Sequence, residues 1–252
     1  MSNIYDALQI AHGEREASAK NLKDTPTVSL PALLKQDTPF SRSTLYQDSE
    51  LSILAQSITA LLPTPDKNVI QFIGSRSGEG TSTLIREFAM VSAKQGDDPV
   101  LLIEADHVKP CQYQAFGVES IPPVDQMLQN GSSLDGVIAQ VEESNLFLAT
   151  LSAQLQSSLA NRNNFGPSDL WKAIRTKFSL ILIDSSPASV TSDSLAICAK
   201  VDGVVLVVEA EKTRAVVASH VKKQILMREG NLLGIVFTKQ KFHIPKFLYK
   251  FL

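Results

Sequence analysis

The fold is decided by the stretch Phe72-Ile73-Gly74-Ser75-Arg76-Ser77-Gly78-Glu79-Gly80-Thr81-Ser82-Thr83. It follows an apolar, β-branched run and opens a helical pattern, which is the context of a phosphate-binding loop. Gly78 and Gly80 let the backbone approach a polyphosphate closely, and the next N–H groups point at it from a helix N-terminus. The candidate nucleotide-binding residues are Ser75, Arg76, Ser77, Gly78, Glu79, Gly80, Thr81, Ser82 and Thr83.

The loop departs from the pattern G-x-x-x-x-G-K-[ST] at two positions. Ser75 stands in place of the first glycine, and Thr81 stands in place of the lysine. That lysine meets the β- and γ-phosphates, and threonine cannot supply its charge. Arg76 or Lys109 could replace it, and Gly80→Asp should abolish binding by placing a carboxylate in the phosphate position. The alternative interpretation is a glycine-rich strand-to-helix turn that binds nothing.

From residue 68 onward, short apolar runs alternate with helical patterns. Runs without polar alternation are typical of strands that are covered on both faces. The expected strands are 69–73, 100–103, 146–149, 180–183, 204–208 and 233–237, and the expected helices between them are 83–94, 168–177, 192–199 and 214–228. This alternation predicts an α/β fold with a doubly wound, mostly parallel sheet of the P-loop NTPase kind.

The two ends of the chain differ from this central region. Residues 1–47 hold a short helical pattern at 4–11 and then a polar, proline-containing arm without periodicity. A helix is expected at 49–62, so the NTPase-like domain is placed at 48–240. The tail 241–252 is basic and aromatic, and it either docks on an anionic membrane surface or a partner, or caps the domain's own core.

Composition narrows the classes of protein. The chain has 252 residues, a formal net charge of −2 and two cysteines. This charge argues against a protein that coats nucleic acid, and two isolated cysteines favour a reducing compartment. No apolar run approaches the roughly 18 residues of a membrane span, and no secretory signal is visible at the start. These features predict a cytoplasmic protein without a nucleic-acid partner.

Acidic residues end two of the expected strands. Asp184 follows four apolar residues, which is the Walker B pattern, and Glu104 and Asp106 close the strand 100–103. Because a Mg²⁺–nucleotide needs carboxylates at the carboxyl ends of neighbouring strands, we assign Asp106, Asp184 and Glu104 as candidate catalytic residues. The candidate metal ligands are Ser82, Asp106 and Asp184. A single such acid could equally be a helix cap or a turn residue.

Five blocks of sequence together resemble the bacterial tyrosine kinases (BY-kinases) and their CpsD/CapB exopolysaccharide-biosynthesis relatives, within the Min/Par class of deviant P-loop ATPases. The loop 77–83 is similar to the family's P-G-E-G-K-S-T, and 100–110 is similar to its Walker A′ segment V-L-L-I-D-A-D-x-R-[RK]-P. The blocks 178–193, 201–208 and 233–237 are similar to F-D-x-V-I-x-D-x-P-P…T-D-A, D-G-v-l-l-V-v and l-G-v-V-l-N.

The chain departs from this family at positions that carry its chemistry. Thr81 replaces the loop lysine, and Glu104 replaces the first Walker A′ aspartate. The family's oligomerising E-x-x-R-x-x-R motif has become Glu50, Ile53 and Gln56, and the tail holds one tyrosine, Tyr249, instead of a cluster. The Walker A is therefore degenerate, and nucleotide chemistry is expected to be weakened.

The resemblance implies ATP or ADP with Mg²⁺ as cofactors, with binding weakened by Thr81. It also implies contact with the cytosolic part of a membrane polysaccharide chain-length or co-polymerase protein, at the inner face of the cell membrane. Three functions stay open: a nucleotide-binding or wholly degenerate regulator of this pathway, an active kinase or ATPase, and a DNA-partition-type ATPase. The charge balance and the missing loop lysines disfavour the third.

Overall fold

A computed structural model describes residues 48–62, 68–129, 136–153, 171–172 and 174–240. Contacts divide the chain into two units, Met1–Asp37 and Thr38–Leu252, and the described residues all belong to the second. The helical pattern at 4–11 and the tail 241–252 lie outside the described residues. Among those that are described, no helix is both long enough and apolar enough to span a lipid bilayer.

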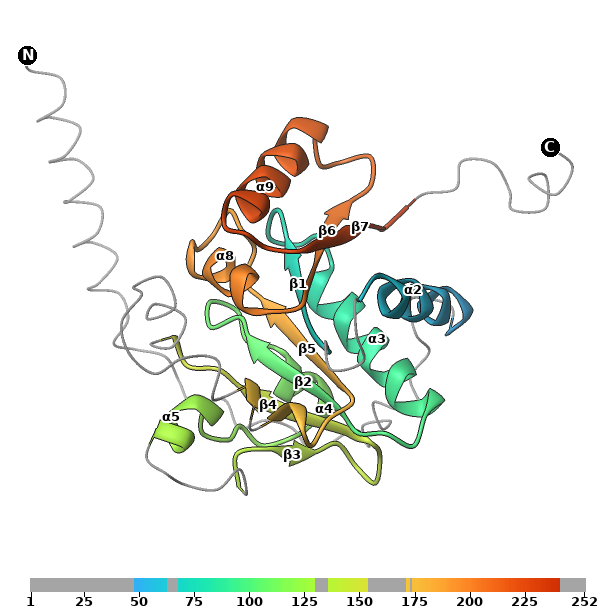
Figure 1. Ribbon diagram of the computed structural model, residues 1–252, viewed down its shortest axis with the longest axis vertical. Helices are drawn as coiled ribbons and strands as arrows, with labels where there is room; N and C mark the ends of the chain where they lie inside the picture. The colour runs from blue at the N-terminus through green and yellow to red at the C-terminus, as the bar shows by residue number, and fades with distance from the viewer. Residues whose placement is uncertain (1–47, 63–67, 130–135, 154–170, 173, 241–252) are drawn as a thin grey trace, which may run out of the picture. The chain divides into compact units, whose positions relative to one another are not determined.

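Seven strands form one sheet in the order β3-β4-β2-β5-β1-β6-β7 (Figure 1). Every neighbouring pair is parallel except β3 with β4, which is antiparallel. The predicted mostly parallel α/β sheet is thus confirmed. The strands are β1 (Val69–Gly74), β2 (Val100–Ala105), β3 (Ala139–Gln140), β4 (Leu146–Thr150), β5 (Leu180–Ser185), β6 (Gly203–Glu209) and β7 (Leu232–Thr238).

Helices cover both faces of the sheet (Figure 1). They are α2 (Asp48–Leu61), α3 (Thr81–Gln95), α4 (Gln112–Phe116), α5 (Val124–Gln129), α8 (Asp193–Ile197) with the 3-10 turn Cys198–Lys200, and α9 (Ala215–Met227). Residues 171–172 and 174–175 are also helical, and Trp171 is buried among core residues. The helices α4 and α5 and the strand β3 were not predicted.

The side chains of the central strand β1 point alternately into the apolar clusters on the two faces of the sheet. Ile70 and Phe72 pack with α2 and α3, and Phe72 stacks at a tilt on Phe88 with 5.6 Å between ring centroids. Val69 and Ile73 lie in the clusters on the opposite face. Because both faces are buried, the strand is apolar at almost every position. The loop that leaves β1 therefore starts from a fixed base at the carboxyl edge of the sheet.

Candidate functional site

The loop between β1 and α3 turns through two glycines with left-handed backbone. Gly78 has φ 85° and Gly80 has φ 88°, conformations that residues with a Cβ adopt at a cost. The first intrahelical bond of α3 runs from the Leu84 N–H to the Gly80 carbonyl at 2.9 Å. The N–H groups of residues 81–83 thus precede the helical ladder, and they give this helix end a partial positive charge.

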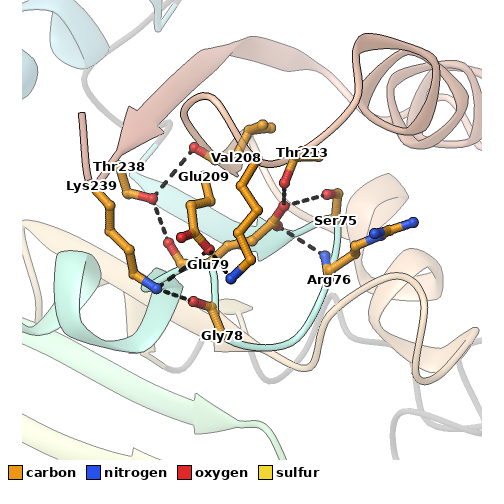
Figure 2. Close-up of polar contacts among 10 residues, drawn as sticks. Ser75, Arg76, Gly78, Glu79, Val208, Glu209, Thr213, Thr238 and Lys239 are labelled. Atoms are coloured by element: carbon orange, nitrogen blue, oxygen red, sulfur yellow. Dashed lines mark hydrogen bonds and ion pairs between the residues drawn. The ribbon is translucent and has the colours of Figure 1, made fainter. Parts of the chain in front are cut away.

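The Glu79 carboxylate holds the loop together from within (Figure 2). Its side chain is buried, and its oxygens accept hydrogen bonds from the Ser75 hydroxyl at 2.7 Å, the Arg76 N–H at 2.9 Å and the Thr213 hydroxyl at 2.5 Å. Three donors, two from the loop and one from the segment after β6, thus converge on one carboxylate. The sequence identified Glu79 as a loop residue, whereas its partner Thr213 was not anticipated.

Neither cation suggested for the missing charge contacts the loop's interior. The guanidinium of Arg76 is exposed and extends away from Glu79 in Figure 2, and Lys109 is exposed on the turn after β2. The Thr81 side chain is buried, and its hydroxyl would lie 2.7 Å from a Cβ placed on Gly74. The position of the family lysine therefore points toward the end of β1, inside the turn of the loop.

The structure corrects the reason given for a defect in Gly80→Asp. A Cβ on Gly80 would point to Lys239 and Thr238, whose nearest atoms lie 3.8 and 3.9 Å away. An aspartate there would also have to keep the left-handed backbone at φ 88°. The substitution should therefore act by straining the backbone of the loop, with its side chain directed toward the end of β7, and not by directly filling the phosphate position.

Two of the predicted catalytic acids are neighbours across the sheet. Glu104 on β2 is paired in register with Asp184 on β5. Asp184 is fully buried and accepts a hydrogen bond from the Ser82 hydroxyl at 3.2 Å, so the structure brings two of the three candidate metal ligands together. Burial raises the pKa of the Asp184 carboxyl to about 7, because the charged form loses its hydration.

Glu104 and Asp106 are engaged by backbone donors in this structure. Glu104 Oε1 accepts the N–H groups of Cys111 and Gln112 at 2.5 and 2.8 Å, so it caps the start of α4. Burial, the largest effect, nevertheless raises the pKa of Glu104 above its ordinary value. Asp106 Oδ1 accepts the Ser186 hydroxyl at 2.6 Å and the N–H groups of Val108 and Lys109. Asp106 thus also fits the alternative interpretation as a turn residue.

Residues that sequence reasoning missed complete this acidic cluster. The Gln112 amide donates to Asp184 Oδ2 at 2.6 Å and to the Ser82 carbonyl at 3.0 Å, while its oxygen accepts from Arg86 at 2.9 Å. Cys111 lies with Glu104 and Asp184 so that one ligand atom of each falls within 4.8 Å of the others. Oxygen ligands from Ser82 and Asp184 suit Mg²⁺, which would have to displace the Gln112 amide to use both Asp184 oxygens.

The raised pKa of Asp184 predicts a pH-dependent stability. Between pH 4 and 7 the folded state holds a proton that the unfolded state has lost, so rising pH lowers the free energy of unfolding. Asp184→Asn removes this proton uptake. We expect the melting temperature of Asp184→Asn minus that of wild type, both measured without Mg²⁺, to be about 5 °C more positive at pH 8 than at pH 4.5. Asp97→Asn, on the surface, is the control, and a gap that is the same at both pH values would contradict the prediction.

No family model matches the sequence. Tyrosine-protein kinase YwqD of Bacillus subtilis is 27% identical over 164 residues, which are 65% of this chain and 69% of YwqD. Tyrosine-protein kinase CpsD of Streptococcus agalactiae is 25% identical over 177 residues, 69% of this chain and 76% of CpsD. The crystal structure of the VpsO kinase domain superposes with a TM-score of 0.64 at 26% identity, covering 77% of this chain and 96% of that one.

These curated relatives and this structural neighbour are bacterial tyrosine kinases, and the chain is similar to them in sequence and fold. Its departures from the BY-kinase motifs can now be placed on the fold. Thr81 begins helix α3 at the loop, and Glu104 lies on β2 beside the Walker B strand β5. Ile53 and Gln56, at the positions of the two BY-kinase arginines, are exposed on α2.

The BY-kinase strand motif that ends in asparagine also marks a residue overlooked in the sequence. The pattern l-G-v-V-l-N matches 233–237, so Thr238 stands at the asparagine position. Its hydroxyl donates to the Glu79 carbonyl at 2.5 Å, which brings the end of β7 against the phosphate loop. The motif comparison could have assigned Thr238 to the site, because the family places a hydrogen-bonding side chain there.

Proposed function

We propose that this chain is a nucleotide-binding BY-kinase homologue of weak or absent catalytic activity that regulates exopolysaccharide or capsule biosynthesis or export. It acts through the cytosolic part of a membrane chain-length or co-polymerase protein. The protein works in the cytoplasm, peripherally at the inner face of the cell membrane, and the segment 241–252 supplies the membrane contact. The observation that supports the proposal is the β1–α3 loop, which has the glycine turns expected of a phosphate loop and Thr81 at the position of the lysine.

Binding and chemistry make different demands on this site. The glycine turn, the N-terminus of α3 and the internal Glu79 bonds supply oriented backbone donors, which account for much of the affinity of a loop for phosphate. Phosphoryl transfer also needs a cation at the β- and γ-phosphates, and the described residues place none at Thr81. A site with the first set and without the second favours binding over turnover.

One observation favours the alternative of an active autokinase or ATPase. The Ser82 hydroxyl lies 3.2 Å from Asp184, so two oxygens are in position to share a Mg²⁺ ion at the loop. Glu104 and Asp106 lie on or just after the neighbouring strand β2. The two functions share the bound nucleotide and differ in turnover, so one pair of assays on the same preparation distinguishes them.

Nucleotide binding is the first expected result. The purified full-length chain should bind ADP and ATP with Mg²⁺ at micromolar to submillimolar concentrations in titration calorimetry, with little release of phosphate. Ser82→Ala removes the hydroxyl that would face Mg²⁺ and should reduce the Mg²⁺ dependence of binding while leaving the backbone donors in place. Ser57→Ala, a matched exposed serine on α2, is the control. No binding by the wild type up to millimolar nucleotide would refute the proposed function.

A further inference from the structure

The end of β7 holds the phosphate loop from outside through two consecutive residues. Thr238 donates its hydroxyl hydrogen to the Glu79 carbonyl at 2.5 Å, and the Lys239 ammonium donates to the Gly78 carbonyl (Figure 2). These partners are 159 and 161 positions apart in the sequence. We call this pair, Thr238 and Lys239, the β7 clamp.

The clamp fixes the direction of two peptide groups at the centre of the loop. All peptides described are trans, and in a planar trans peptide the N–H points opposite to the C=O. With the carbonyls of Gly78 and Glu79 turned toward β7, the N–H groups of Glu79 and Gly80 must point away from it. Successive N–H groups that point to one side form an anion-binding nest.

The position of Lys239 is specific to this contact. Its side chain passes over Gly80, with Cε 3.8 Å from where a Cβ of Gly80 would lie, and its ammonium also pairs with Glu209 at 3.4 Å. Its backbone has φ 54°, in the left-handed region that favours glycine. A lysine held in an unfavourable backbone conformation, with its ammonium on a loop carbonyl, is a feature that surrounding contacts must maintain.

Thr238 links the loop to the sheet more rigidly than Lys239 does. Its side chain is fully buried, and its hydroxyl also lies 3.4 Å from the Val208 carbonyl at the end of β6. The loop is therefore supported on two sides. Glu79 bonds to Ser75, Arg76 and Thr213 through its side chain, and to Thr238 through its main-chain carbonyl.

From these contacts we propose that the β7 clamp sets the affinity of the loop for the polyphosphate of a nucleotide. It does so by holding the Glu79 and Gly80 N–H groups toward the phosphate and by keeping one ammonium at the rim of a loop that has lost its own lysine. This inference rests on the proposed nucleotide binding. Thr238 and Lys239 act here as positioning residues, and no role in bond breaking is assigned to them.

The test compares Lys239→Met and Thr238→Val with Lys239→Arg and Lys212→Met. Methionine keeps the length of lysine without its charge, valine keeps the shape of threonine without its hydroxyl, and arginine keeps a cationic donor. Lys212 is the matched control, because its ammonium pairs with the same Glu209 at 3.1 Å from a different segment. Thermal denaturation verifies that each variant is folded.

Calorimetry should show that Lys239→Met and Thr238→Val each lower the affinity for ADP by about tenfold. The affinities of Lys239→Arg and Lys212→Met should stay within about threefold of wild type. The affinity for inorganic pyrophosphate should fall by a similar factor, since the clamp acts on the N–H groups that face the phosphates and not on the nucleotide base. Amide hydrogen exchange of a peptide covering 74–81, measured without ligand, should be faster in the first two variants than in the other two.

Failure of the clamp and failure of the proposed function give different results. If wild type binds ADP and both Lys239→Met and Thr238→Val bind it with the same affinity, the proposed role of the clamp is wrong and nucleotide binding still stands. Wild type that binds neither ADP nor pyrophosphate would overturn the proposed function and the role of the clamp in affinity together. Unchanged loop exchange in Lys239→Met and Thr238→Val would overturn the claim that β7 holds the loop.

Discussion

Thr81→Lys is expected to raise ATP turnover about 100-fold and to tighten nucleotide binding, because it restores a preorganised cation to the one loop position that lacks it. Thr81 is the first residue of α3, and its hydroxyl points toward Gly74 inside the loop. A lysine that starts there would run along the inner side of the loop, where the proposed nucleotide would place its phosphates. Loss of a single preorganised donor from an enzyme site typically slows the chemical step by about 10²–10³, and its return should recover a similar factor.

The matched control is Thr81→Met, which adds similar length without charge. Phosphate release is measured for wild type and both variants at saturating ATP and Mg²⁺, and ADP affinity is measured by calorimetry. If Thr81→Lys and Thr81→Met behave alike, the charge at this position is not what limits the chain. Equal turnover in wild type and Thr81→Lys, at a rate typical of an active kinase, would favour the alternative function over the regulator.

The fold could be predicted because each buried strand is a short run of apolar residues that is visible in the sequence by itself. Expected strand 69–73 became Val69–Gly74, and expected strand 204–208 became Gly203–Glu209, since both faces of these strands are covered and nearly every residue is apolar. The two-residue strand β3 exists through its pairing with β4, and α4 and α5 have five and six residues. Elements this short contain too few turns or alternations for a periodic pattern to emerge.

The site could be predicted only in part, for a related reason. Sequence patterns placed Ser82 and Asp184 in the same site, because strand ends in a parallel sheet converge on one edge. They could not show that the Gln112 amide, 72 positions before Asp184, binds it, or that Thr213 binds Glu79 from 134 positions away. Such contacts depend on how loops fold over the edge, and loops carry no periodicity to read.

Glu104 shows how a correct location can coexist with an unforeseen contact. Its place on β2 beside Asp184 matches the Walker A′ position. Its extra methylene, relative to aspartate, lets the carboxylate extend, and Oε1 meets the N–H groups that open α4. A carboxylate in that position stabilises a helix N-terminus by its charge, so Glu104 has a structural partner that competes with any metal.

Incubation of the isolated protein with ATP and Mg²⁺ is expected to yield no phosphotyrosine and no ring-shaped oligomer. BY-kinases, which this chain resembles, phosphorylate in trans within a ring that arginines on the oligomerising helix help to form. In α2 the corresponding residues are Ile53, whose surface is 64% exposed, and Gln56, which is also exposed. Isoleucine donates no hydrogen bonds, and glutamine lacks the charge and the fork geometry of arginine.

The tail also offers fewer tyrosines that could accept phosphate, since Tyr249 is the one tyrosine in the segment 241–252. Mass spectrometry of the intact and digested protein measures the phosphate, light scattering measures the oligomer, and Tyr249→Phe identifies any signal that comes from the tail. Ile53→Arg combined with Gln56→Arg tests whether a lost interface explains the absence, because it restores the two cations on a face of α2 that already points to solvent. Stoichiometric phosphate on Tyr249 in the wild type would refute the regulator and establish the autokinase, because it requires both a transfer that proceeds without the loop lysine and a neighbouring subunit that presents the tail.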